Sequence, residues 1–111
     1  MITVDFFLNE DGAFAGFQFE GHAGAGGYGY DIVCSAVSAL SITTVNAVES
    51  LTEASFEEEE ADEEGGFLKV ILTPPSMEDH DAQLLIRTLY MGISQMADSY
   101  PENLRIRHIE R

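Results

Sequence analysis

The first 20 residues alternate between apolar and polar positions around a tight turn, and this pattern commits the chain to a β-sheet. Residues 2–8 place their larger apolar side chains on one face with period two, which predicts a half-buried strand. These side chains are Ile2, Val4, Phe6 and Leu8. Residues 9–12 (Asn-Glu-Asp-Gly) are typical of a turn, because an Asp-Gly pair suits positive φ. Residues 13–20, with three phenylalanines, then predict the second strand of a hairpin.

The patterns further along the chain predict two helices and two or three more strands. Apolar side chains recur at helical spacing from Ile32 to Leu51, and again between Ser76 and about Ser99, where Tyr100-Pro101 ends the pattern. Strands are predicted for residues 67–72 and 104–108, and residues 55–60 are expected to add an exposed, charged edge strand.

This order, ββ-α-(β)β-α-β, predicts an α+β fold. We expect a single two-layer domain over residues 1–111, with a mostly antiparallel sheet of four or five strands and two helices on one face. Asp31 is expected to be the N-cap or a first-turn acid of the first helix. Ser76 is expected to cap the second, with Asp79 three residues later as in a capping box.

The charge is strongly acidic, with 20 Asp and Glu against 5 Lys and Arg and a net charge of −15. Direct binding of nucleic acid through a basic surface is therefore not expected, whereas basic partners are favoured. Hydrophobic residues make up 45% of the chain, which argues against disorder. The acidic run Glu57–Glu64 is more often a solvated face than a binding surface, and both interpretations stay open.

The cellular compartment follows from the cysteine count and the N-terminus. A single cysteine cannot form an internal disulfide, so no oxidising compartment is implied. The first eight residues lack a basic stretch and contain Asp5, unlike a signal peptide. No unbroken run of 18 apolar residues occurs, so no membrane span is expected. We expect a soluble cytoplasmic protein.

The only cysteine, Cys34, follows His22 by twelve positions, and a glycine-rich stretch separates them. If the first helix begins near Asp31, Cys34 lies in its first turn, where unpaired N–H groups and the helix dipole favour a thiolate. A thiol, an imidazole and a mobile backbone are the parts of a cysteine hydrolase. The alternatives are that Cys34 is an inert core residue and that His22 is a polar residue at a strand end. A metal site has no supporting spacing, and no cofactor or metal is expected.

The glycines between these two residues can serve as a gate. Gly24, Gly26, Gly27 and Gly29 allow a loop to open for a peptide and close over it. The stretch lacks the Lys and Ser/Thr of a phosphate-binding loop, and the remaining alternative is a plain connector. Ser38 lies four residues after Cys34 on the same helical face, where it can bond within the site or pack against the sheet.

Residues 21–38 resemble the ribosomal-processing cysteine proteases, the Prp family. The resemblance lies in Gly21-His22-Ala23, the glycine-rich stretch, and Gly29-x-Asp31-Ile32-Val33-Cys34-x-Ala36-Val37-Ser38. The total length and the Gly-Phe-Leu-x-Val strand after an acidic stretch also fit. Two departures are Ser35, where alanine is common, and the length of the acidic run.

The resemblance implies a bacterial cysteine endopeptidase with Cys34 as nucleophile and His22 as general base and acid. Asp31 and Ser38 would support this dyad. The implied substrate is the N-terminal extension of a basic large-subunit ribosomal protein, cut after aromatic residues before ribosome assembly. The resemblance also implies a homodimer.

Two rival functions use the same residues differently. A non-catalytic module would hold a basic ribosomal protein on its acidic face, with binding that weakens as salt rises. A thiol redox or metal sensor would show reversible oxidation or metal uptake at Cys34.

Overall fold

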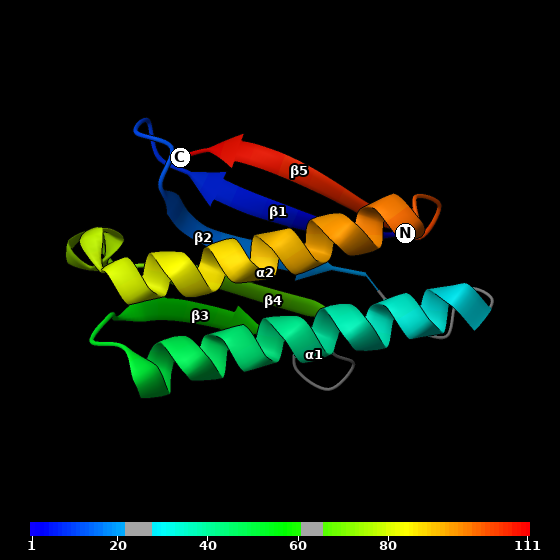
Figure 1. The fold of residues 1–111 in the computed structure, drawn as a ribbon, viewed down its shortest axis with the longest axis horizontal. Helices are drawn as coiled ribbons and strands as arrows, with labels where there is room; N and C mark the ends of the chain where they lie inside the picture. Colours follow the sequence, from blue (N-terminus) through cyan, green and yellow to red (C-terminus); the bar gives the residue numbers. More distant parts are fainter. Residues whose placement is uncertain (22–27, 61–65) are drawn as a thin grey trace.

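A layer of two helices covers one face of a five-stranded sheet in the computed structural model, which describes residues 1–21, 28–60 and 66–111 (Figure 1). The strands and helices in chain order are β1 Ile2–Leu8, β2 Phe14–Glu20, α1 Tyr28–Leu51, β3 Phe56–Glu60, β4 Phe67–Leu72, a 3-10 turn Pro74–Glu78, α2 His80–Ser99 and β5 Leu104–Glu110. The predicted α+β class and the predicted order of elements are confirmed, including the acidic edge strand.

The sheet has the strand order β3-β4-β2-β1-β5. Its pairs are antiparallel except for β1 and β5, which run parallel with Val4 opposite Ile106. A register shift at Phe7/Leu8 interrupts the β1–β2 hairpin. The sheet is therefore mixed but mostly antiparallel, as expected, and β3 and β5 are its edges.

The core lies between the sheet and the helices. Ile2, Val4 and Phe6 of β1 are fully buried there, and the Phe6 ring meets the Tyr90 ring of α2 edge-on at 4.9 Å. The helices contribute residues at helical spacing to this core. They are Val33, Val37, Val45 and Val48 from α1, and Ala82, Ile86, Leu89 and Ile93 from α2.

The prediction that β1 is half-buried is wrong, because the opposite face of this strand is covered as well. Asp5 is 3% exposed and Phe7 is 6% exposed. Long basic side chains cover them: Arg107 bonds Asp5, while the Lys69 and Arg111 charges lie 5.8 and 5.5 Å from the Phe7 ring centre. Alkyl stems and cation–π contacts thus replace a second helical layer on this face.

Helix α1 begins at Tyr28, three residues before the expected start near Asp31. Asp31 is therefore not the N-cap of α1 but an acid at the end of its first turn, the other possibility that the sequence left open. Gly29 belongs to that turn instead of a gating loop. Leu40 and Leu51 share the helical spacing of the apolar side chains in α1, but they are 39% and 72% exposed. Ile32–Leu51 would pass for a membrane span by length and a mean hydropathy of 1.5, a character that core helices share.

The N-cap of α2 is Asp79, so the prediction of Ser76 is wrong. The Asp79 carboxylate accepts a hydrogen bond from the Ala82 N–H at 2.8 Å. Pro74 and Pro75 open a separate 3-10 turn, which suits their fixed φ. The Ser76 hydroxyl is already engaged, since it accepts from the Ser55 N–H at 2.8 Å and bonds the Thr73 hydroxyl.

Candidate active site

Cys34 lies in the second turn of α1, six residues after Tyr28. Its side chain is half-buried and packs against the edge of the core. The expected place in the first turn is therefore wrong, because the helix starts earlier than Asp31 indicated. The backbone N–H of Cys34 belongs to the body of the helix, where such groups bond the carbonyl four residues before. This thiol remains reachable from solvent.

His22 and three of the four glycines assigned to the gate, Gly24, Gly26 and Gly27, lie outside the described residues. Gly21, the residue before His22, is among the described residues. Gly21 directly follows β2, and its N–H donates to the Gly66 carbonyl at 2.8 Å. A Cβ at Gly21 would lie 3.0 Å from the Cα of Ile2, and the φ of Gly21 is +144°, so any larger residue would be strained there. The residue before the histidine is thus fixed against β1 and the start of β4.

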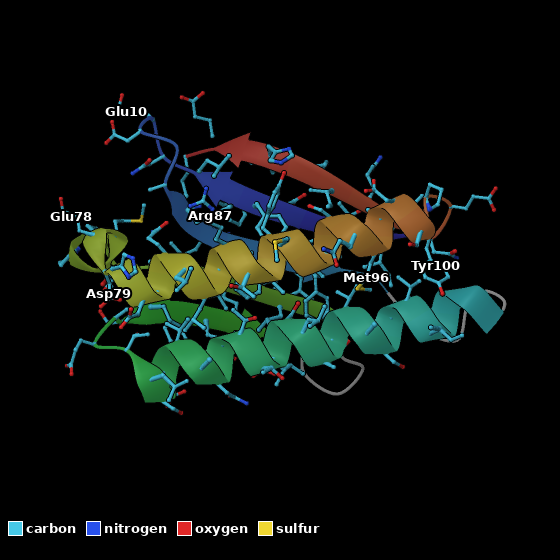
Figure 2. All side chains as sticks on the ribbon, viewed as in Figure 1. Glu10, Glu78, Asp79, Arg87, Met96 and Tyr100 are labelled. Carbon is cyan, nitrogen blue, oxygen red and sulfur yellow. The ribbon has the colours of Figure 1, made fainter. Side chains whose placement is uncertain are left out.

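In Figure 1 this end of β2 is directed toward the half of the molecule that holds the N-terminal turns of α1. The end of α2 that carries Met96 and Tyr100 lies over the same part of α1, whereas Glu10 and Glu78 mark the opposite end of the molecule (Figure 2). The early turns of α1, which include Cys34, are therefore flanked by the C-terminal end of α2.

Ser38 lies one helical turn after Cys34, half-buried, and lines a cavity of about 280 Å³ between α1 and the sheet edge. We call this cavity the acidic groove. It is lined by Phe19, Ser38, Ile42, Val45, Asn46, Glu58, Glu60, Gly66, Phe67 and Leu68. Since residues four apart on a helix are neighbours, the groove opens next to the side of α1 that carries the thiol.

The groove carboxylates were not singled out from the sequence, which offered only the whole acidic run. Strand alternation would have distinguished Glu58 and Glu60 from the other acids of the run, because these two share one face of β3. Partial burial, a hydrogen bond to Glu60 and the charges of Glu60 and Glu49 together raise the pKa of Glu58 above its ordinary 4.5. The two carboxylates on one face of β3 therefore concentrate negative charge at the groove.

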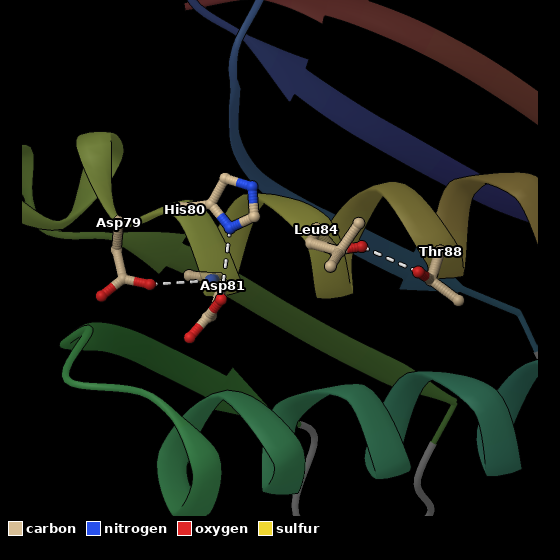
Figure 3. Close-up of polar contacts among 6 residues, drawn as sticks. Asp79, His80, Asp81, Leu84 and Thr88 are labelled. Carbon is tan, nitrogen blue, oxygen red and sulfur yellow. Dashed lines mark hydrogen bonds and ion pairs between the residues drawn. The ribbon is translucent and has the colours of Figure 1, made fainter.

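The other two histidines, His80 and His108, have contacts of their own. His80 is exposed at the start of α2, where its Nδ1 lies 3.2 Å from Asp81 (Figure 3). That end of α2 is remote from the start of α1 (Figure 1). His108, in β5, bonds the Tyr90 hydroxyl at 2.7 Å. Across residues 1–21, 28–60 and 66–111 no three His, Cys, Asp or Glu side chains form a metal-binding group.

Comparison with known proteins gives matches over nearly the whole chain. A family model described as Cysteine protease Prp matches residues 1–105. The ribosomal processing cysteine protease Prp of Staphylococcus aureus is 32% identical over 108 residues, covering 97% of this chain and 99% of the relative.

Two solved structures share the fold. The S. aureus ribosomal processing protease Prp, crystallised with a covalently linked product peptide, has a TM-score of 0.86 at 32% identity. The match covers 97% of this chain and 99% of that one. SMU.848 from Streptococcus mutans has a TM-score of 0.88 at 34% identity, covering 100% and 96%.

The fold and these matches define the chain as a cysteine-type peptidase, a hydrolase. It belongs to the cysteine protease Prp family, and the resemblance found in residues 21–38 is confirmed over the whole chain.

Proposed function

We propose that this peptidase removes the N-terminal extension of a basic large-subunit ribosomal protein, cutting after an aromatic residue. The observation that carries the proposal is the full-length similarity to the S. aureus ribosomal processing protease, whose crystal structure holds a covalently linked product peptide. A covalent peptide requires a nucleophile, and Cys34 is the only cysteine in this chain and is partly exposed.

In the proposed mechanism Cys34 and His22 act as a dyad. His22 takes the proton of the Cys34 thiol, and the thiolate attacks the peptide carbonyl. His22 then protonates the leaving amine as the thioester forms, and water hydrolyses the thioester to release the extension. Asp31 and Ser38 support the dyad, and the glycines from Gly24 to Gly27 allow the polypeptide to enter.

The helix start supplies donors for the oxyanion. The first four N–H groups of α1, from Tyr28 to Asp31, have no partner within the helix. Side chains on a helix lean toward its N-terminus, so a substrate held at Cys34 lies on the side of these groups. Their partial positive charge favours an oxyanion, although Cys34 itself lies one turn further along.

Charge supports the choice of substrate. The net charge of −15 attracts a basic ribosomal protein and speeds its encounter with the enzyme. The proposed setting is the cytoplasm, where the protein would act as a homodimer before ribosome assembly. Light scattering of the purified protein would test the dimer by giving twice the mass of 12.2 kDa.

The direct test is to incubate the protein with a tagged precursor of the ribosomal protein, with and without a thiol alkylator. We expect one cut that removes the extension, and no cut after alkylation or with Cys34→Ala. A precursor that is bound but never cut by the wild-type protein contradicts the proposal and favours the non-catalytic module. Cleavage that survives Cys34→Ala contradicts the assigned nucleophile.

A further inference from the structure

The acidic groove combines an apolar floor with a charged rim. Phe19 and Leu68, which face each other across the β2–β4 pair, are buried at its base. Ile42 of α1 is 51% exposed at its wall. Its volume is just below the roughly 300 Å³ at which small-molecule pockets begin, so it suits a few side chains of a polypeptide.

The rim comes from β3, where alternation divides four glutamates between the two faces of the sheet. Glu58 and Glu60 face the helices and line the groove. Glu57 and Glu59 point to the other face, where Glu59 lies opposite Lys69. Among the described lining residues none is basic, so the two groove carboxylates repel each other without a compensating cation.

We propose that the acidic groove binds a substrate segment in which an apolar side chain stands beside a lysine or arginine. The apolar side chain packs against Phe19 and Leu68, and Glu58 and Glu60 accept the cation. The inference rests on the proposed function and deepens it, because it assigns two specificity-determining residues. If the whole acidic run attracted the substrate at long range, glutamates on either face of β3 would contribute equally. Binding in the acidic groove requires Glu58 and Glu60 in particular.

The experiment compares two double variants that remove equal charge from opposite faces of one strand. Glu58→Gln/Glu60→Gln changes the groove, and Glu57→Gln/Glu59→Gln is the matched control. Both are made in a Cys34→Ala background, so that binding is measured without turnover. The probe is a fluorescent peptide spanning the cleaved bond of the ribosomal precursor, alongside the same peptide with every lysine and arginine replaced by norleucine.

We expect the groove variant to bind the basic peptide about 2- to 20-fold more weakly, the range for two solvent-accessible ion pairs. The control should lose less than about twofold, since only long-range screening acts there. The norleucine peptide should bind both variants alike, because it keeps the apolar contacts and lacks the cation.

If the two double variants lose equal affinity for the basic peptide, or if neither loses any, the proposed role of the acidic groove is contradicted. The same holds if the norleucine peptide loses affinity for the groove variant as the basic peptide does. A parallel turnover assay with the Cys34-containing enzyme separates the two proposals. Absence of cleavage would contradict the proposed function. Normal cleavage combined with equal peptide affinities of the two double variants would contradict only the proposed role of the acidic groove.

Discussion

At the scale of single residues, the pair between Asp5 and Arg107 shows how one strand is buried without a second layer. The Asp5 carboxylate accepts from Arg107 Nε at 2.8 Å and from Nη2 at 3.0 Å. This bidentate contact also raises the pKa of Arg107. A buried carboxylate without its partner is costly, because it cannot regain water.

We therefore expect Arg107→Met to lower the urea midpoint of unfolding with an unchanged slope. Arg105→Met is the control, since it removes a charge from the same strand and the same face, and it should leave the midpoint nearly unchanged. Equal midpoints for the two variants would show that the Asp5 contact contributes nothing to stability.

Glu58 makes stability depend on pH in a direction opposite to that of a salt-bridged acid. Because its pKa is raised in the folded chain, the folded state binds this proton more tightly than the unfolded state. The free energy of unfolding therefore falls as pH rises from 4.5 through the raised pKa. The charges facing Glu58 are Glu60 and Glu49, both of the same sign.

Glu58→Gln should accordingly be more stable than the wild type at neutral pH and equal to it near pH 4. Urea unfolding at several pH values measures this difference. Glu57→Gln removes the same charge from the other face and should give a smaller gain. If the two gains match at every pH, local crowding in the acidic groove is not the cause.

At the scale of secondary-structure elements, two glycines predict opposite effects of the same substitution. A Cβ at Gly16 in β2 would lie 2.0 Å from the Val70 carbonyl oxygen, so the β2–β4 pair would have to move. A Cβ at Gly92 in α2 would meet only the end of Leu40, at 3.4 Å. Backbone cannot yield as a partly exposed leucine can.

Gly16→Ala should therefore destabilise the chain by about 1–3 kcal/mol, the cost of overpacking. Gly92→Ala should stabilise it by about 0.5–1 kcal/mol, because alanine is the better helix former. Chemical denaturation of both variants checks the signs. Two changes of the same sign would contradict the packing described for these positions.

The helices also show where sequence patterns end. The valine spacing of α1 located the face that packs on the sheet, because burial imposes that spacing. Neither helix start followed from the sequence. Asp31 and Ser76 are both residue types that cap helices well. However, α1 already begins at Tyr28, and the Ser76 hydroxyl accepts a hydrogen bond from the Ser55 N–H. For α2, the Ser76 hydroxyl bonds a residue 21 positions away, a contact that no local pattern shows.

At the scale of the whole molecule, the class of fold and the strand positions were predictable from local periodicity. The parallel pairing of β5 with β1 was not, since it joins the two ends of the chain. The candidate site was also predictable only in part. Residue types and spacing pointed to Cys34 and Ser38, whereas the acidic groove appears only when β3 is set beside α1.

The most direct measurement of the central claim is detection of the acyl-enzyme. The wild-type protein is mixed with precursor, quenched in acid within one turnover and weighed intact by mass spectrometry. We predict a species with the mass of the enzyme plus the removed extension minus one water, with the adduct mapped to Cys34. An adduct at another residue, or cleavage that persists after Cys34 is alkylated, would contradict the account.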